Sequence, residues 1–172
     1  MNAVLDVSYE HSRSIAACVM FRRWGDAVPA EVVRTVAPAA RGYRVGRFYE
    51  RELPCLLAVL DHACRRFDTV VIDGYVHLDD RVGKGLGAHL FESLPYRPAV
   101  VGVAKRPLAV ATGVIPVYRG ASRRPLYVSA AGWPAGAAAA AIEAMHGPYR
   151  LPTLLKLADR CARAEADKDY LL

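Results

Sequence analysis

Apolar and polar positions at the start of the chain follow the pattern of β-strands joined by short turns. Three runs rich in apolar and β-branched residues predict strands over residues 3–8, 15–22 and 31–37. Turn-forming residues separate them at 11–14 and at Trp24-Gly25-Asp26. Because the connections between these strands are short, we expect an antiparallel meander.

The pattern changes to helical spacing after residue 52. Apolar residues recur every three or four positions from Leu53 to Phe67, which predicts an amphipathic helix. Proline is tolerated in a first helical turn, so Pro54 indicates that this helix begins close to Leu53. Glu52 would then lie at the N-terminal edge of the helix.

The rest of the chain alternates between strands and helices. Apolar runs predict strands over residues 69–72, 99–104 and 126–130, and helices over 85–94, 134–147 and 152–166. Fully apolar strands that alternate with helices are typical of a parallel sheet covered on both faces. Three antiparallel strands followed by parallel strands predict an α/β fold with an RNase H-like mixed sheet. We expect residues 1–172 to form one such domain.

Composition agrees with a folded protein that does not enter a membrane. The chain has 172 residues, of which 53% are hydrophobic, yet no apolar run is long enough to span a bilayer. The N-terminus has no basic segment followed by an apolar one, so we expect no signal peptide and a cytoplasmic protein. The four cysteines lack the spacing of a metal site, and we expect them to be reduced core residues.

The charge of the chain favours a polyanionic partner without identifying one. The net charge is +6, and arginines cluster within residues 41–51, 65–66 and 119–124. A solvated surface explains such clusters equally well. Charge alone therefore leaves the partner open.

Three carboxylates occupy positions from which they could bind a metal. Asp6 interrupts an apolar strand, Asp73 ends another before Gly74, and Glu52 precedes a helix. Each has a structural explanation: an edge residue, a turn residue, and a residue that compensates the helix dipole. Together they supply the oxygen ligands that Mg²⁺ prefers, and two bridged cations can clamp a phosphodiester during hydrolysis. Lys105, which ends a neighbouring strand, could neutralise charge on the scissile phosphate.

Other candidate motifs are weaker. Gly83, Gly85 and Gly87 look like a phosphate-binding loop, but their spacing matches neither common nucleotide-binding motif. His89 falls on the apolar side of its predicted helix, which is the usual position of a core histidine. We expect the polar segment 77–80 to be a surface loop.

Several segments resemble endonuclease V, a deoxyinosine 3′ endonuclease. They are Leu5-Asp6-Val7, Arg51-Glu52-Leu53-Pro54, Val71-Ile72-Asp73-Gly74, Gly87-Ala88-His89-Leu90, Val101-Gly102-Val103-Ala104-Lys105, Tyr149-Arg150-Leu151-Pro152 and Ala158-Asp159. The resemblance covers most of the chain, and the Asp-Gly and Gly-Val-Ala-Lys segments are its most specific part. It implies an RNase H-like fold, a requirement for Mg²⁺ or Mn²⁺, and cleavage at the second phosphodiester bond 3′ to inosine, which is deaminated adenine.

The resemblance also implies roles for single residues. Asp6, Glu52 and Asp73 would hold the metals, Lys105 would face the substrate, and Asp159 would be a further catalytic acid. The position of Asp159, at the border of the apolar face of its predicted helix, agrees with this. The residues that would contact the substrate are Tyr43, Arg44, Arg51, Gly74 and His89.

The chain would be a short, divergent member of that family. It would lack the N-terminal helical segment, and Gly42-Tyr43-Arg44-Val45 replaces the Pro-Tyr-Ile-Pro wedge that separates strands. The histidine that follows the strand aspartate is not cleanly matched, since Asp79 or Asp80 falls nearest, with His77 close by. We therefore expect single-stranded or distorted inosine-containing DNA or RNA as the partner. A nuclease with another lesion or structure preference, and a non-cleaving nucleic-acid-binding relative, are the alternatives.

Overall fold

The computed structural model describes residues 1–10, 13–38, 49–79, 83–109, 111 and 113–164. Its strands are β1 (Asn2–Glu10), β2 (Arg13–Phe21), β3 (Glu31–Pro38), β4 (Thr69–Asp73), β5 (His77–Asp79), β6 (Gly83–Lys84), β7 (Ala99–Ala104), β8 (Ile115–Val117) and β9 (Leu126–Ala131). Its helices are α1 (Tyr49–His62), α2 (Leu86–Ser93), α3 (Ala135–Ala144) and α4 (Thr153–Arg163).

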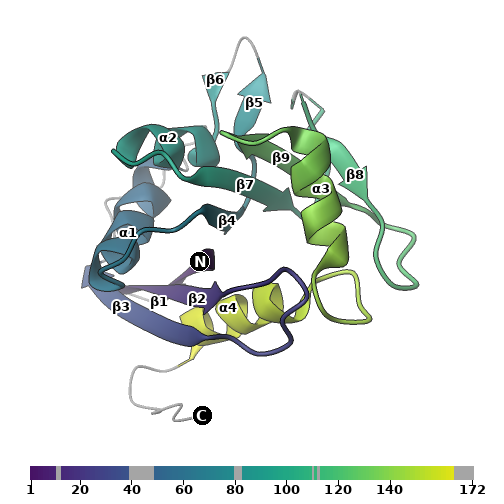
Figure 1. The fold of residues 1–172 in the computed structure, drawn as a ribbon. Coiled ribbons are helices and arrows are strands. Elements are labelled where there is room, and N and C mark those ends of the chain that lie inside the picture. The colour runs from purple at the N-terminus through teal and green to yellow at the C-terminus, as the bar shows by residue number, and fades with distance from the viewer. Residues whose placement is uncertain (11–12, 39–48, 80–82, 110, 112, 165–172) are drawn as a thin grey trace.

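Seven strands form one mixed sheet in the order β3-β2-β1-β4-β7-β9-β8 (Figure 1). The first three strands pair antiparallel, and β4 and β7 then add in parallel to β1. The predicted mixed sheet, antiparallel first and parallel afterwards, is confirmed. The strands β9 and β8 extend it with two antiparallel pairings, and β5 and β6 form a separate hairpin. The sequence pattern predicted neither feature.

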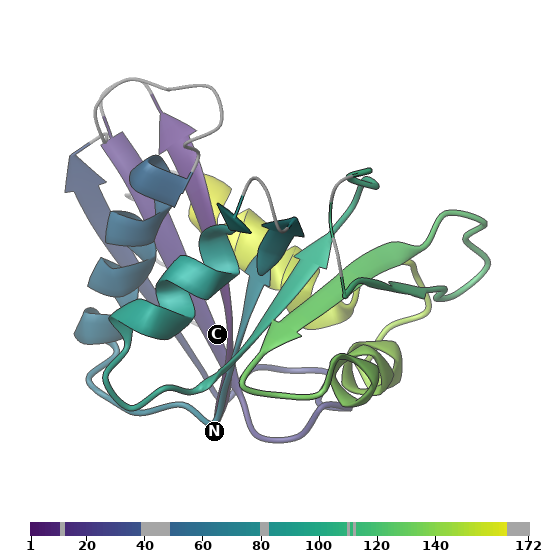
Figure 2. The same ribbon diagram turned by 90° about the horizontal axis from the view of Figure 1, so that it is seen from above.

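Helices cover both faces of the sheet, as predicted (Figure 2). On one face, α1 and α2 pack against alternate strand residues such as Leu5 and Ile72. On the other face, α3 and α4 pack against the intervening residues, such as Val4, Val71 and Val103. A strand buried on both sides must be apolar at every position, which explains the continuous apolar runs in the sequence.

Helix α1 begins earlier than the position of its proline predicted. It starts at Tyr49 rather than near Leu53, so Pro54 lies in its second turn and Glu52 lies within the helix. The proline has no N–H to donate to the carbonyl of Glu50. The apolar face that follows it is buried in the core, and this packing stabilises the helix despite the missing donor.

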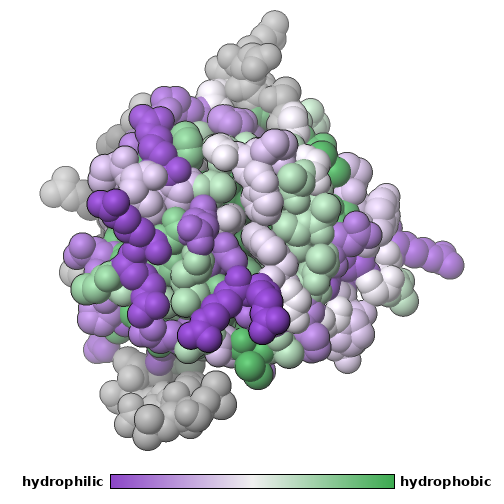
Figure 3. Space-filling view, viewed as in Figure 1, coloured by the Kyte–Doolittle hydropathy of each residue, from purple (hydrophilic) through white to green (hydrophobic). Residues whose placement is uncertain are grey.

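The remaining sequence predictions concern single residues and the surface. Three of the four free cysteines are buried as predicted, but Cys64 is exposed after the end of α1. Among the described residues, no helix has both the length and the apolar character to cross a membrane. The edge at which β1 and β4 begin shows hydrophilic side chains scattered among hydrophobic ones (Figure 3). That the whole chain forms one domain stays a prediction.

Candidate active site

The strand register places Asp6 and Asp73 next to one another. Strands β1 and β4 pair in parallel up to Leu5 and Ile72, and the two aspartates are the residues that follow. Side chains alternate between the faces of a strand, so both aspartates point to the α4 face, as Val4 and Val71 do. The parallel register of β1 and β4 therefore brings the two carboxylates together at the point where β4 ends.

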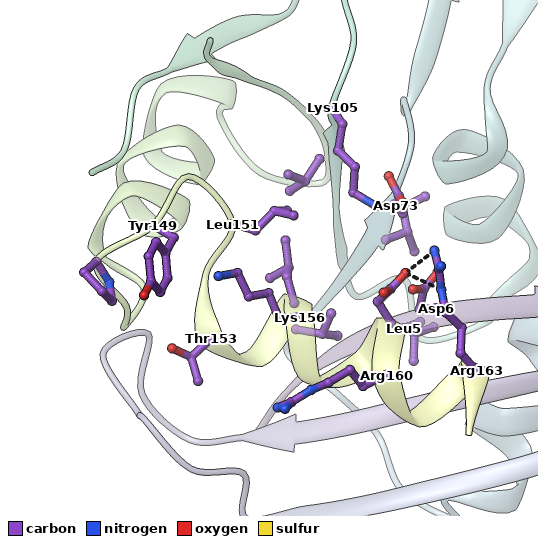
Figure 4. Close-up of a pocket in the computed structure, with 16 residues that line it drawn as sticks. Leu5, Asp6, Asp73, Lys105, Tyr149, Leu151, Thr153, Lys156, Arg160 and Arg163 are labelled. Atoms are coloured by element: carbon purple, nitrogen blue, oxygen red, sulfur yellow. Dashed lines mark hydrogen bonds and ion pairs between the residues drawn. The ribbon is translucent and has the colours of Figure 1, made fainter. Parts of the chain in front are cut away.

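Lys105 joins this pair from β7. The last paired residue of β4 is Asp73, which lies opposite Val103, and Lys105 follows two positions later. Its ammonium Nζ lies 2.6 Å from Oδ2 of Asp73, and the two side chains point toward each other (Figure 4). Burial opposes the charge on Lys105, but the bond to Asp73 and the carboxylates around it raise its pKa overall. Lys105 is thus held as a cation at the end of the sheet.

Glu52 and Asp159 complete the group from helices on opposite faces. Glu52 belongs to α1 and Asp159 to α4, which pack on the two sides of the sheet. Both line a cavity of about 500 Å³ with Asp6, Asp73 and Lys105. The structure brings the five residues that the sequence nominated for catalysis to one cavity.

The carboxylates in this cavity repel one another. Burial, followed by the charge of Asp73, raises the pKa of Asp6 to about 6. Burial, followed by the charges of Asp6 and Asp73, raises the pKa of Glu52 to about 8. On the α4 side, Asp159 pairs with Arg163, whose Nη2 lies 2.8 Å from Oδ1. Negative charge therefore accumulates around Asp6, and a bound cation would relieve the repulsion.

The donor atoms in this cavity are of the type that binds a divalent cation, but they are not arranged in coordination geometry. Carboxylate oxygens facing a water-accessible cavity are the ligands of Mg²⁺ and Mn²⁺. Within the described part of the chain, however, no three His, Cys, Asp or Glu side chains are already grouped closely enough to hold a metal. The Lys105 ammonium also occupies one oxygen of Asp73. A cation would have to draw the carboxylates together and share Asp73 with Lys105.

Glycines hold the segment after Asp73 close to β7. Gly74 has a φ of +134°, and its N–H bonds the carbonyl of Val103 at 3.2 Å. A Cβ on Gly102 would stand 2.5 Å from the Gly74 carbonyl and 2.9 Å from Oγ of Ser129, so only glycine fits there. That buried hydroxyl accepts the N–H of Val76 at 3.0 Å. Gly74 and Gly102, which belong to the segments that resemble endonuclease V, thus shape the backbone that carries Asp73.

Two glycines of the Gly83, Gly85 and Gly87 segment, Gly85 and Gly87, have a packing role. Gly85 lies against the carbonyl of Tyr75 and Gly87 against Val76, where an added Cβ would stand 2.6 Å from the Tyr75 oxygen and 2.7 Å from the Val76 side chain respectively. This contact seats the start of α2 on the loop that follows Asp73. That these glycines do not form a nucleotide-binding loop stays a prediction.

A smaller cavity of about 170 Å³ opens on the other side of Asp73. It is lined by Tyr49, Asp73, Gly74, Tyr75, Leu78, Lys84, Gly85 and Leu86. Gly74, a nominated substrate contact, therefore lies in its wall. His89 does not line the cavity, but its ring stacks on Tyr49 at a centroid distance of 3.7 Å, and burial lowers its pKa. His89 thus supports a wall of the cavity from behind.

Arg51 lies beside the carboxylate cavity without lining it. Its guanidinium covers the ring of Tyr9 at 3.6 Å, and Tyr9 and Glu52 are wall residues of that cavity. Tyr43, Arg44 and Asp80 lie outside the described residues, as does the side chain of Asp79. The predicted surface loop at 77–80 includes strand β5, which pairs with β6 in a hairpin.

Two arginines to which the sequence analysis assigned no role bind backbone carbonyls, Arg150 at the end of β7 and Arg119 at the end of α3 and beyond it. The guanidinium of Arg150 donates to the carbonyl of Lys105 and to the carbonyl of Pro125, the latter at 2.7 Å. Arg119 is buried and donates to carbonyls at the end of α3 and in the loop beyond it, namely those of Glu143, Met145, Gly147, Tyr149 and Arg150. Arg119 had been counted with a basic surface cluster, and only its many long-range partners reveal its structural role.

One family model matches most of this chain, and solved structures of that family share its fold. A family model described as Endonuclease V matches residues 1–160. Human ENDOV is 21% identical over 94% of this chain and 82% of its own, with a TM-score of 0.74. Endonuclease V from Streptomyces avermitilis is 26% identical over 94% and 78%, with a TM-score of 0.73. A search of curated proteins by sequence gives no match.

A third structure carries nucleic acid. Endonuclease V from Ciona intestinalis, in complex with a 24mer DNA containing an inosine followed by a ribo-adenosine, has a TM-score of 0.74 to this chain. It is 17% identical over 94% of this chain and 84% of its own. At that identity the likeness concerns the fold, which the two proteins share over nearly the whole described chain.

Proposed function

Because the chain belongs to the endonuclease V family, we propose that it is a divalent-metal-dependent endonuclease acting on inosine-containing DNA or RNA. The bond hydrolysed would be the second phosphodiester bond 3′ to inosine. The observation that carries this proposal is the single cavity lined by Asp6, Glu52, Asp73, Lys105 and Asp159. A cytoplasmic location is part of the proposal.

Asp6, Glu52 and Asp73 are the residues that would hold Mg²⁺ or Mn²⁺. Such an ion, when bound, supplies a nucleophilic water at neutral pH and stabilises charge on the phosphoryl oxygens. The electrostatics of these carboxylates support the assignment, because burial and then the charges of neighbouring carboxylates raise the pKa values of Asp6 and Glu52. Asp159 would act as a further acid at the border of the same cavity.

Lys105 would bind the scissile phosphate. Lys105 lines the carboxylate cavity, and a phosphoryl oxygen placed next to Asp73 would meet its ammonium within hydrogen-bond reach. The bond to Asp73 holds the ammonium beside the carboxylates, and Lys105 would share Asp73 with the bound cation. Arg150 holds the backbone at Lys105 and would act as a positioning residue.

The smaller cavity beside Asp73 would hold the modified base. Its wall combines the ring of Tyr49 and the apolar Leu78 with backbone of Gly74, a mixture suited to stacking on a purine and bonding its edge. A base extruded into this cavity would place its own strand across Asp73 and Lys105. The Ciona relative bound to inosine-containing DNA supports inosine as that base.

We expect single-stranded or distorted substrates to be preferred over intact duplex. Extruding a base from a duplex costs a few kcal/mol, and a proline-stiffened wedge would offset part of that cost. Gly42-Tyr43-Arg44-Val45 has no proline, although Tyr43 could still stack on a base and Arg44 could hold the backbone. Equal or faster cutting of duplex in a side-by-side assay at matched salt would contradict this preference.

The test is cleavage of end-labelled oligonucleotides that carry one inosine or, as control, one adenine. With Mn²⁺ or Mg²⁺ we expect a single cut at the second phosphodiester 3′ to inosine, no cut in the control, and none in the presence of EDTA. DNA, RNA and mixed strands of one sequence determine which sugar the site accepts. Equal cutting of the inosine and adenine strands would refute inosine specificity.

A non-cleaving nucleic-acid-binding relative is the second candidate. The observation that favours it is the ion pair between Lys105 and Asp73, which occupies an oxygen that a metal would need. Binding of inosine oligonucleotides without any cut, across a range of Mn²⁺ concentrations, would establish this candidate over the first.

A further inference from the structure

A second large cavity runs from the active site along α4. It has a volume of about 500 Å³ and shares Asp6, Asp73, Lys105, Asp159 and Arg163 with the carboxylate cavity. Beyond these it extends to a set of residues that no catalytic role requires, which we call the α4 groove. The α4 groove consists of Tyr149, Leu151, Thr153, Leu155, Lys156 and Arg160.

The rim of the α4 groove is basic. Lys156, Arg160 and Arg163 follow one another at intervals of four and three residues, which places them on one face of α4. All three line the cavity, and Figure 4 shows them along the helix beside the active site. Arg163 is paired with Asp159, whereas among the described residues no carboxylate forms an ion pair with Lys156 or Arg160. These two cations are available to an anion in the groove.

The floor of the α4 groove is apolar, and an aromatic ring stands at its far end. Leu151 and Leu155 are half-buried and line the groove together with Val4 of β1. Tyr149 is 64% exposed, and Nζ of Lys156 lies 3.8 Å from the centroid of its ring. A large exposed aromatic ring beside a cation can bind a ligand in two ways. It offers a flat apolar surface for stacking, and the cation offers a positive charge.

These features match the chemistry of single-stranded nucleic acid. Proteins bind such strands with a basic groove that follows the phosphates and aromatic rings on which bases stack. A free phosphate or a mononucleotide would use one cation and leave the rest of the groove empty. A strand that already occupies the active site would continue into the α4 groove, since the two cavities share Asp73 and Lys105.

We propose that the α4 groove binds the nucleotides on the 3′ side of the scissile bond, with Lys156 and Arg160 on phosphates and Tyr149 stacked on a base. The inference rests on the proposed function for its polarity. The base cavity lies on the α1 and α2 side of Asp73, and the α4 groove on the opposite side. If inosine, which precedes the cut, occupies the first, then the strand that follows the cut occupies the second.

The first test is binding of a single-stranded inosine oligonucleotide in EDTA, so that no cleavage is needed. The double variant Lys156→Gln/Arg160→Gln is compared with Arg22→Gln/Arg23→Gln, which removes the same charge from exposed positions at the opposite edge of the sheet. We expect the groove variant to bind about tenfold more weakly at moderate salt. Its plot of log affinity against log salt should also be less steep, by about 1.4 in the magnitude of the slope. The control variant should match the wild type in both respects.

The second test locates the strand. A 5-bromouracil placed two to four nucleotides 3′ of inosine should crosslink to Tyr149 on irradiation, and the same base at equal distances on the 5′ side should not. Tight binding with crosslinks elsewhere, or a groove variant that binds like the control, would overturn the inference and leave the proposed function intact. Failure to bind any inosine strand would overturn both.

Discussion

Aspartates stand at both edges of the central sheet, and their surroundings differ. At the edge where β1 and β4 begin, Asp26 accepts the N–H groups of Arg22 and Arg23 in a turn, and these bonds hold its pKa below the usual value. Asp68 there pairs with the amino group of Met1. At the edge where β4 ends, burial, followed by the charge of Asp73, raises the pKa of Asp6 instead.

The difference separates structural carboxylates from functional ones. A carboxylate that serves the fold finds donors nearby and is stabilised in its charged form. A cluster of carboxylates that raise each other's pKa costs stability, and such clusters concentrate at functional sites. The two edges belong to the same sheet and the same residue type, so the contrast lies in the burial of the carboxylates and in their partners.

The largest effect is expected at Asp73. Asp73→Asn should lower metal-dependent cleavage of an inosine oligonucleotide by about 10³-fold with the fold retained, because it removes both a metal ligand and the anchor of Lys105. Asp26→Asn, the same change at the opposite edge, should leave cleavage unaltered and lower the melting temperature slightly. Full activity of Asp73→Asn would refute the site; circular dichroism checks the fold of both variants.

A smaller loss is expected for Lys105. Lys105→Ala should slow cleavage by about 10²-fold while Mn²⁺ binding persists, since the ammonium contacts the phosphate rather than the metal. Arg23→Ala, at the opposite edge, is the matched loss of one cation. Cleavage at the parental rate over low and moderate salt would show that Lys105 is an ordinary surface lysine.

Glu52 should make the metal-free protein less stable as pH rises. Its pKa of about 8 lies above the ordinary value of 4.5, so the folded state keeps a proton that the unfolded state releases. The free energy of unfolding therefore falls between about pH 4.5 and 8. Glu52→Gln removes this penalty and should stabilise the EDTA-treated protein by about 2 kcal/mol above pH 8, with no gain below pH 4.5. Urea unfolding at several pH values measures the difference, and a pH-independent difference would contradict it.

The smallest effect is expected at Arg150. A lysine at this position cannot hold the carbonyls of Lys105 and Pro125 with one planar group, so the end of β7 would shift. Arg150→Lys should lower kcat about tenfold with KM nearly unchanged, because geometry rather than affinity is lost. A change confined to KM would assign Arg150 to substrate binding instead.

The sequence predicted those parts of the molecule that depend on local patterns. Apolar runs located β1, β4 and β7, and polar residues interrupting or ending these runs pointed to Asp6, Asp73 and Lys105. The register of β1 and β4 then places Asp6 beside Asp73, and the alternation of side chains along a strand predicts that both point to the same face. Glu52 was the weakest of the residue-based candidates, since a glutamate at a helix start is common.

Features that depend on long-range contacts were not predictable. The pairing of β9 with β7 joins segments that are far apart in the chain, and β8 is too short to leave a clear pattern. Arg119 and Arg150 resemble surface arginines until the carbonyls that they bind are known. Pro54 misplaced the start of α1 because packing of the following turns outweighed a local rule.

Manganese binding tests the contrast between the two edges most directly. Electron paramagnetic resonance of free Mn²⁺ is titrated with wild-type protein, with Asp6→Asn and with Asp26→Asn. The account predicts that the wild type and Asp26→Asn deplete the free signal equally, whereas Asp6→Asn depletes it far less. Equal depletion by all three proteins, or none by the wild type, would contradict the assignment of a metal centre at the edge where β4 ends.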